Sequence, residues 1–238
     1  MDADQVLERL RALESPRDRE GMARFGTNPH HALGISVAKL RAIARKIGRD
    51  HDLALGLWAS GIHEARILAT IVDDPELVSK EQMQSWVEDF ESWDLCDQAC
   101  MNLFWRAECG VEVALEWAGR DEEFVKRAAF ALMARFATKR AKASDELLES
   151  FLPIIEEASD DDRNFVRKAV SWALRGIGKR NAHLNELAIE SAERIRARNT
   201  KSARWIAHDA LRELTSDKVR ARGERKEILG QKYGRGCR

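Results

Sequence analysis

The chain has 238 residues, of which 44% are hydrophobic and 34% are charged, and its 40 basic and 40 acidic residues cancel. This length can bury a large core, and the composition is too apolar for a disordered segment. No apolar run approaches the ~20 residues that span a bilayer, which excludes a membrane protein. The N-terminus lacks the apolar stretch of a secretory signal. We therefore expect a cytoplasmic globular protein whose cysteines are reduced thiols.

The charge is unevenly distributed along the chain. Residues 163–238 contain twenty Lys or Arg against eight Asp or Glu, a net charge of +12, whereas residues 73–123 carry a net charge of −12. Two interpretations remain open at this point. Either the basic segment attracts a polyanion such as nucleic acid, or neighbouring surface helices neutralise one another.

Apolar residues recur at intervals of three and four, which is the period of amphipathic helices. Sustained alternation with a period of two, typical of strands, is absent. Residues that end or start helices separate the apolar segments. These breaks fall at 48–50, 61–63, 73–75, 118–121, 159–162 and 215–217. The pattern predicts an all-helical protein.

An internal repeat becomes visible when the chain is slid by 41 residues. Residues 124–129 (FVKRAA) then align with residues 165–170 (FVRKAV), and Trp205 begins a fainter third copy. A period near 40 in a helical sequence is typical of HEAT and armadillo repeats, which stack into a solenoid with a concave groove. Chance similarity between two amphipathic helices is the alternative. We predict a single solenoid domain over residues 1–222, followed by a basic, flexible tail over residues 223–238.

Motifs of conventional nucleotide-binding and metal enzymes are absent, so we expect no cofactor and no metal. Cys96, Cys100 and Cys109 could form part of a soft-metal site, but nothing completes four ligands, which favours thiols in the core.

Trp93 and Asp97 lie four residues apart on a predicted helix and therefore share one of its faces. An aromatic ring beside a carboxylate can attract a cation, and the carboxylate can stabilise a developing positive charge or act on a water molecule. Structural roles are the alternative. Ser92 or Asp94 would then cap the helix, and Asp97 would pair with a basic neighbour.

Trp172 lies on a second predicted helix, near Arg175 and Lys179. Guanidinium and ammonium groups beside an aromatic ring are suited to gripping a nucleic-acid backbone. A tryptophan in an apolar helix is, however, normally part of the core. We assign five other tryptophans to the core or to helix packing: Trp58, Trp86, Trp105, Trp117 and Trp205.

These residues carry a family resemblance. Residues 92–97 (SWDLCD) resemble the W-D-L-x-D motif of the AlkD-type DNA alkylation repair family, the HEAT-like repeat DNA glycosylases. Residues 124–127 (FVKR) resemble its W-x-R-R motif, and residues 171–175 (SWALR) resemble its G-W-x-L-R motif, in the same order. The resemblance extends from about Phe25 to the helix of Trp205.

The chain departs from the family pattern at three positions. Phe124 replaces the family tryptophan, Lys126 replaces the first arginine, and Phe25 stands where a tyrosine is common. Phe25 lacks the hydroxyl that the family tyrosine carries, whereas the catalytic set that the resemblance implies is present: Trp93, Asp97, Arg127 and Trp172.

The resemblance implies a DNA glycosylase of base excision repair. Its substrate would be double-stranded DNA with positively charged N3- or N7-alkylated purines, and the base would not enter a pocket. Asp97 would stabilise the oxocarbenium-like sugar and position the attacking water, while Trp93 and Trp172 would line the cleft. The residues implied to contact DNA are Phe25, Lys126, Arg127, Arg175 and Lys179.

Two other functions compete with this hypothesis. A HEAT-like protein can bind damaged or branched DNA without cleaving it, although a pure binder has no need of Asp97 facing a polyanion. An α-solenoid can also serve as a protein-interaction scaffold, although the basic C-terminal third argues against it. We expect the protein to act as a monomer at the nucleoid.

Overall fold

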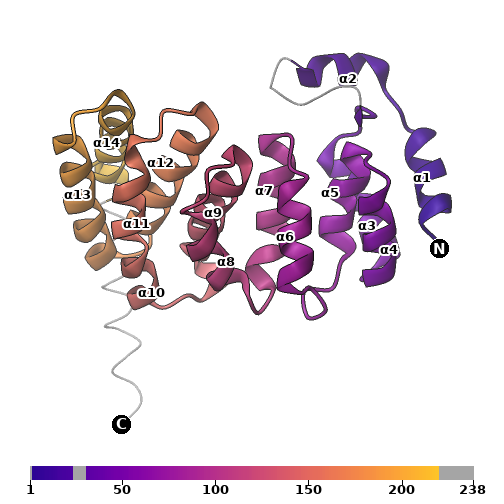
Figure 1. Ribbon diagram of the computed structural model, residues 1–238, viewed down its shortest axis with the longest axis horizontal. Coiled ribbons are helices and arrows are strands. Elements are labelled where there is room, and N and C mark those ends of the chain that lie inside the picture. Colours follow the sequence, from indigo (N-terminus) through magenta and orange to yellow (C-terminus); the bar gives the residue numbers. More distant parts are fainter. Residues whose placement is uncertain (1, 24–30, 220–238) are drawn as a thin grey trace, which may run out of the picture. The chain divides into compact units, whose positions relative to one another are not determined.

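The computed structural model describes residues 2–23 and 31–219, which contain helices and no strand (Figure 1). The all-helical prediction is confirmed. Two compact units divide the chain, unit 1 (Met1–Val113) and unit 2 (Ala114–Arg238). The single domain expected over residues 1–222 stays a prediction, and the tail at 223–238 lies outside the described residues, as does Phe25.

The helices of unit 1 surround a core of aliphatic and aromatic side chains. Its helices are α1 (Ala3–Arg11), α2 (Pro16–Ala23), α3 (Val37–Ile47), α4 (His51–Ala59), α5 (His63–Val72), α6 (Lys80–Glu88) and α7 (Trp93–Asn102), followed by the 3-10 helix η2 (Phe104–Arg106). Helix α5 packs against α3, α4 and α7. The rings of Trp58 and Trp86 stack with their centroids 3.9 Å apart. These two side chains are buried, as the sequence predicts.

Unit 2 contains two rows of helices. Helix α8 (Gly110–Trp117) crosses the boundary between the units, and the helices that follow are α9 (Glu123–Phe136), α10 (Asp145–Ser150), α11 (Leu152–Glu157), α12 (Asn164–Gly178), α13 (Ala182–Ala197) and α14 (Lys201–Leu214). Two 3-10 helices, η3 (Lys139–Ala141) and η4 (Ala158–Asp160), lie between them. Helix α12 contacts α9 on one side and α14 on the other, while α13 contacts α11 (Figure 1).

Local chemistry explains where these helices begin and end. The side chains of Asp50, Asn181 and Thr200 accept hydrogen bonds from backbone N–H groups in the first turns of α4, α13 and α14. Such N-caps satisfy donors that have no partner within the helix. Gly48 and Gly61 follow α3 and α4 with φ of +83° and +69°, a left-handed conformation that favours glycine. The predicted breaks at 48–50, 73–75 and 118–121 fall between helices, whereas those at 61–63, 159–162 and 215–217 each overlap helical residues at one end.

The 41-residue repeat is a structural repeat. Phe124 begins α9 and Phe165 begins α12, and their rings lie 5.6 Å apart between centroids. Trp205, near the start of α14, stacks under the guanidinium of Arg167, whose Cζ lies 4.6 Å from the ring centroid. Trp205 thus lies at the contact between α12 and α14, as expected for helix packing, although 37% of the residue is exposed.

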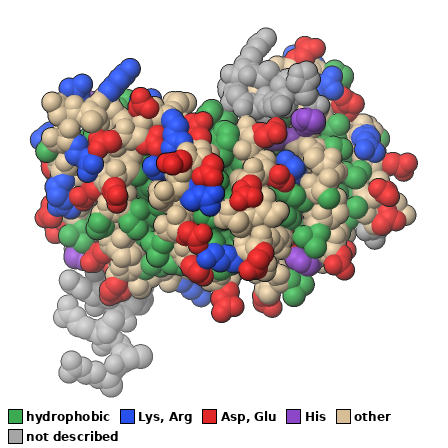
Figure 2. Space-filling model, in the orientation of Figure 1, with side chains coloured by type: hydrophobic (Ala, Val, Ile, Leu, Met, Phe, Trp, Pro, Cys, Tyr) green, Lys and Arg blue, Asp and Glu red, His purple; other side chains and the backbone are tan. Residues whose placement is uncertain are grey.

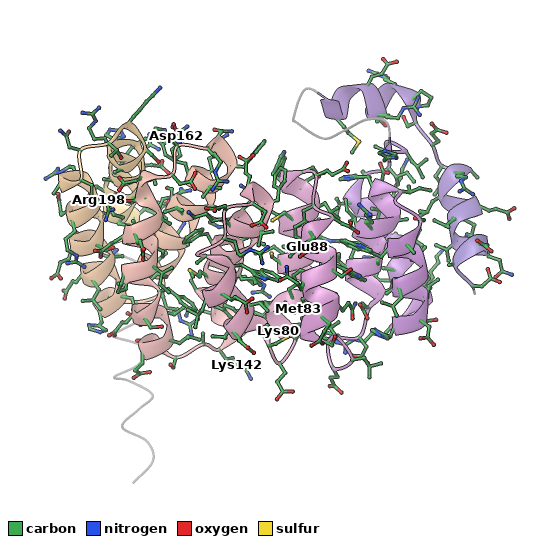
Figure 3. The ribbon with its side chains drawn as sticks, viewed as in Figure 1. Lys80, Met83, Glu88, Lys142, Asp162 and Arg198 are labelled. Carbon is green, nitrogen blue, oxygen red and sulfur yellow. The ribbon has the colours of Figure 1, made fainter. Side chains whose placement is uncertain are left out.

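Ion pairs also connect successive repeats in unit 2. The guanidinium of Arg194 bonds Glu156 at 2.8 Å. That of Arg198, a residue labelled in Figure 3, bonds Asp160 at 2.6 Å. The partners in each pair are 38 residues apart, which is close to one repeat. These pairs fasten the end of α13 to α11 and η4.

None of the helices at 2–23 and 31–219 is long and apolar enough to cross a membrane.

Candidate nucleic-acid interface

Helix α7 carries two residues of unit 1 that the sequence predicts to belong to the functional site. Trp93 begins the helix and Asp97 lies one turn later, and both are partly exposed. Leu95, Cys96 and Ala99 form the buried side of the same helix. The structure therefore places Trp93 and Asp97 on one accessible face, as the four-residue spacing predicts.

The other aspartate of the motif, Asp94, has a different environment. Its Oδ2 lies 2.9 Å from Nε2 of His63, a histidine that is 7% exposed. Burial raises the pKa of Asp94, but hydrogen bonds, chiefly from His63, outweigh burial and hold this pKa below its ordinary value. Ser92 stands at the N-cap position without a side-chain capping hydrogen bond. Ser92 thus occupies the cap position that one alternative gave it, but its hydroxyl makes no capping hydrogen bond, and Asp94 lies within the first turn of α7.

Helix α9 carries Lys126 and Arg127 in unit 2. Arg127 is only 6% exposed, and its Nη1 donates a hydrogen bond of 2.7 Å to the backbone carbonyl of Phe165. Its guanidinium also faces the Phe165 ring at 6.0 Å from the centroid. The ammonium group of Lys126 lies 3.2 Å from Asp161. Both basic residues thus fasten α9 to the start of α12.

Helix α12 presents Trp172, Arg175 and Lys179 along one partly exposed side. Glu213 of α14 accepts a hydrogen bond of 2.8 Å from Arg175 and one of 2.9 Å from Lys179. Burial raises the pKa of Glu213, but the hydrogen bonds and charges of these two residues outweigh burial and lower it. Glu213 is therefore a carboxylate at neutral pH, and Lys179 and Arg175 are partly neutralised.

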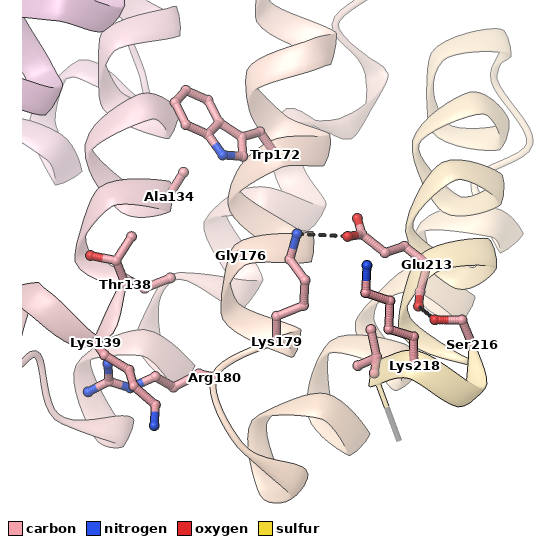
Figure 4. A pocket seen from close by; sticks show the side chains of 12 residues that line it. Ala134, Thr138, Lys139, Trp172, Gly176, Lys179, Arg180, Glu213, Ser216 and Lys218 are labelled. Carbon is pink, nitrogen blue, oxygen red and sulfur yellow. Dashed lines mark hydrogen bonds and ion pairs between the residues drawn. The ribbon is translucent and has the colours of Figure 1, made fainter. Parts of the chain in front are cut away.

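A cavity of about 520 Å³ lies beside Trp172, between α9, α12 and the end of α14 (Figure 4). Lys139, Lys179, Arg180 and Lys218 line it together with one acidic residue, Glu213. Sequence reasoning missed Lys139, Arg180 and Lys218. The repeat offered a signal, because Lys139 and Arg180 are 41 residues apart, so that the same slide superposes them.

The predicted residues therefore form separate groups within the two units. Unit 1 brings together Trp93 and Asp97 on α7. Unit 2 brings together Trp172, Arg175 and Lys179 on α12, and it places Lys126 and Arg127 at the start of α9.

The net charge of +12 over residues 163–238 overstates the cationic surface of this segment. Basic side chains of α12 and α13 pair with carboxylates of neighbouring elements, as Arg175, Arg194 and Arg198 do. Figure 2 accordingly shows basic and acidic side chains interspersed over this part of the surface. Accessible positive charge is therefore concentrated at particular places, among them the cavity beside Trp172.

Two proteins of Listeria are similar to this chain in sequence. "Uncharacterized protein Lin0241" of Listeria innocua serovar 6a and "Uncharacterized protein Lmo0209" of Listeria monocytogenes serovar 1/2a are each 22% identical to it over 196 residues, which is 81% of this chain and 85% of the relative.

One similar solved structure is described as "A new family of proteins related to the HEAT-like repeat DNA glycosylases with affinity for branched DNA structures". It has 20% sequence identity and a TM-score of 0.74, and the match covers 90% of this chain and 96% of that chain. This likeness confirms the predicted fold class, an all-α solenoid of HEAT-like repeats. Residues 6–214 match the family described as DNA alkylation repair enzyme. Because this match spans most of the sequence, the chain belongs to the DNA alkylation repair enzyme family.

Proposed function

We propose that the protein is a DNA N-glycosylase that removes positively charged N3- or N7-alkylated purines from double-stranded DNA. The observation that carries this proposal is the pair Trp93 and Asp97, one turn apart on α7 and both partly exposed. The enzyme would act in base excision repair, as a cytoplasmic monomer at the nucleoid and without a cofactor.

Asp97 is the catalytic carboxylate of the proposed reaction. The N-glycosidic bond breaks with both electrons going to the alkylated base, which leaves as a neutral molecule. Positive charge then develops on the sugar, where the Asp97 carboxylate stabilises it. A water molecule adds to C1′ and passes its proton to Asp97 or to solvent, leaving an abasic site. Since the cationic base is already a good leaving group, no general acid is required.

The remaining residues of the proposed site bind and orient the DNA. Trp93 presents an aromatic face to the cationic nucleotide beside Asp97, and Trp172 presents one to the DNA from α12; neither role requires a pocket for the base. Arg175 and Lys179 attract phosphates, weakened by Glu213. Three further residues complete the proposed set of DNA contacts: Phe25, Lys126 and Arg127.

Release of 3-methyladenine or 7-methylguanine from methylated duplex DNA tests the proposal. The wild type should release the base, Asp97→Asn should not, and both should bind the duplex. Asp52→Asn is a matched control, because Asp52 is an exposed aspartate on α4 in the same unit. Absence of release by the wild type from a panel of alkylated duplexes would refute glycosylase activity.

Binding of branched DNA without cleavage is a second candidate function. It is favoured by the solved relative that is described as having affinity for branched DNA structures, and by the basic cavity beside Trp172. This function predicts tighter binding to a four-way junction than to a duplex of the same length, with no base released from either. Equal affinities for the two DNAs would argue against it.

A further inference from the structure

We propose that the cavity beside Trp172 binds a single unpaired nucleotide, with its base against Trp172 and its phosphate near Lys139 and Lys218. The cavity lies wholly within unit 2. This inference differs from the proposed cleavage, which takes no base into a pocket. It rests on the proposed function only in taking DNA as the source of the nucleotide.

The shape of the cavity suits a flat group at one end. Figure 4 shows the Trp172 ring at one end of the cavity, with Lys139 and Arg180 at the other. Small side chains line the space between them, namely Ala134, Ala137 and Thr138, together with Gly176. An aromatic wall beside small residues leaves room for a nucleobase to stack, and stacking on a side chain accepts every base.

Gly176 lines the cavity without a side chain and so leaves space beside Trp172. A Cβ at this position would lie 3.4 Å from the Cβ of Ala137, so that one methyl group fits closely. A longer side chain would extend into the space beside Trp172. Gly176→Leu is therefore a way to fill the cavity without removing any charge.

Two of the cations that line the cavity are available to an anion. Lys139 and Lys218 are exposed and form no ion pair with any of the described residues. Lys179 instead bonds Glu213 at 2.9 Å, and Arg180 donates a hydrogen bond to the carbonyl of Ala143. Four cations face one carboxylate, so the cavity carries a net positive charge that favours phosphate.

The combination of groups points to a nucleotide. A volume of about 520 Å³ falls within the range of small-molecule sites, roughly 300–1,000 Å³. A nucleotide combines the two groups that complement this lining, a flat base that can stack on Trp172 and a phosphate that can pair with the lysines. The same chemistry occurs in two sources, an unpaired nucleotide of DNA and a free mononucleotide, and the experiment below separates them.

The test measures the binding of undamaged DNA by fluorescence anisotropy. Three duplexes of one sequence are compared: fully paired, with one extra unpaired adenosine, and with an abasic residue in place of that adenosine. Wild-type protein should bind the adenosine duplex about fivefold or more tightly than the other two, since stacking of one base contributes at least this much.

Charge-matched variants locate the effect. Lys139→Gln combined with Lys218→Gln should abolish the preference for the unpaired adenosine, and Gly176→Leu should do the same without a change of charge. Lys168→Gln combined with Lys201→Gln should keep the preference, because these exposed lysines of α12 and α14 do not line the cavity. Circular dichroism establishes that each variant is folded.

A titration with deoxyadenosine monophosphate distinguishes the two sources. In one outcome, the wild type binds the mononucleotide but shows no preference among the duplexes, and this binding is lost when Lys139→Gln and Lys218→Gln are combined. That result would assign the cavity to free nucleotides. If neither the unpaired adenosine nor the mononucleotide depends on these lysines, the inference is wrong. Because all of this DNA is undamaged, the outcome is separate from the release of alkylated bases, and either proposal can fail alone.

Discussion

Helix α7 in unit 1 and helix α12 in unit 2 each present a partly exposed tryptophan, but with opposite charges beside it. Trp93 is followed one turn later by Asp97, whereas Trp172 is followed by Arg175 and Lys179. The first arrangement can stabilise a cation, and the second can attract an anion. In the proposed function, α7 would therefore supply the chemistry and α12 the affinity for DNA.

Asp97→Asn is the strongest way to test this division. We expect base release to fall by about 100-fold or more, the range for loss of an electrostatic stabiliser of a transition state. Affinity for duplex DNA should stay constant or rise, because the change removes a negative charge near a polyanion. Single-turnover rates and anisotropy measure the two effects. A large loss of affinity would contradict the assignment of chemistry to α7.

Trp172→Ala should show the complementary result. We expect affinity for DNA to fall by about fivefold or more, as for loss of a stacking contact. Trp172→Phe should recover part of the affinity, because it retains an aromatic face. The dissociation constants of the two variants measure this directly. Equal affinities for Trp172→Ala and wild type would show that the ring takes no part in binding.

Arg127→Ala should lower the free energy of unfolding as well as the affinity for DNA. Its buried guanidinium donates to the carbonyl of Phe165, and loss of a buried hydrogen-bonding partner costs about 1–3 kcal/mol. The free energy of unfolding in urea measures this loss. Arg140→Ala, which removes an exposed arginine of the same unit, should leave stability nearly unchanged. If Arg127→Ala is as stable as the wild type, the role of Arg127 is instead limited to DNA binding.

Glu213→Gln should strengthen DNA binding by a few fold, because it removes the carboxylate charge that pairs with both Arg175 and Lys179. The logarithm of the affinity should also fall more steeply with the logarithm of salt concentration, by roughly one unit of slope for each additional phosphate contact. Glu186→Gln is the control, since Glu186 is exposed on α13. Weaker binding by Glu213→Gln would show that this carboxylate orients the cations for DNA.

The smallest expected effect concerns Asp94. The pKa of Asp94 is lowered in the folded protein, so its contribution to stability is present above the ordinary aspartate pKa of about 4 and is lost as the pH falls through the lower folded value. The thermal unfolding midpoint should therefore decline less steeply below about pH 4 in Asp94→Asn than in wild type. Identical profiles would contradict this contribution of Asp94.

Local sequence signals were sufficient to predict the helices and the faces they present. The alternation of buried and exposed positions on α7 follows from helical periodicity, and the repeat offset predicted that Phe124 and Phe165 would be equivalent. Partners distant in the sequence were not predictable in the same way. No local pattern indicates that Asp94 meets His63 or that Glu213 meets Lys179, because such pairs depend on the packing of separate helices.

The one-repeat spacing of the pairs Arg194–Glu156 and Arg198–Asp160 restricts how this sequence can evolve. Each residue inserted into α13 before Arg194 would rotate that side chain by about 100° around the helix, away from its partner. An insertion in the turn before α13 can instead be absorbed by the loop. Length variation among relatives should therefore accumulate in turns, while the helices of unit 2 keep their lengths.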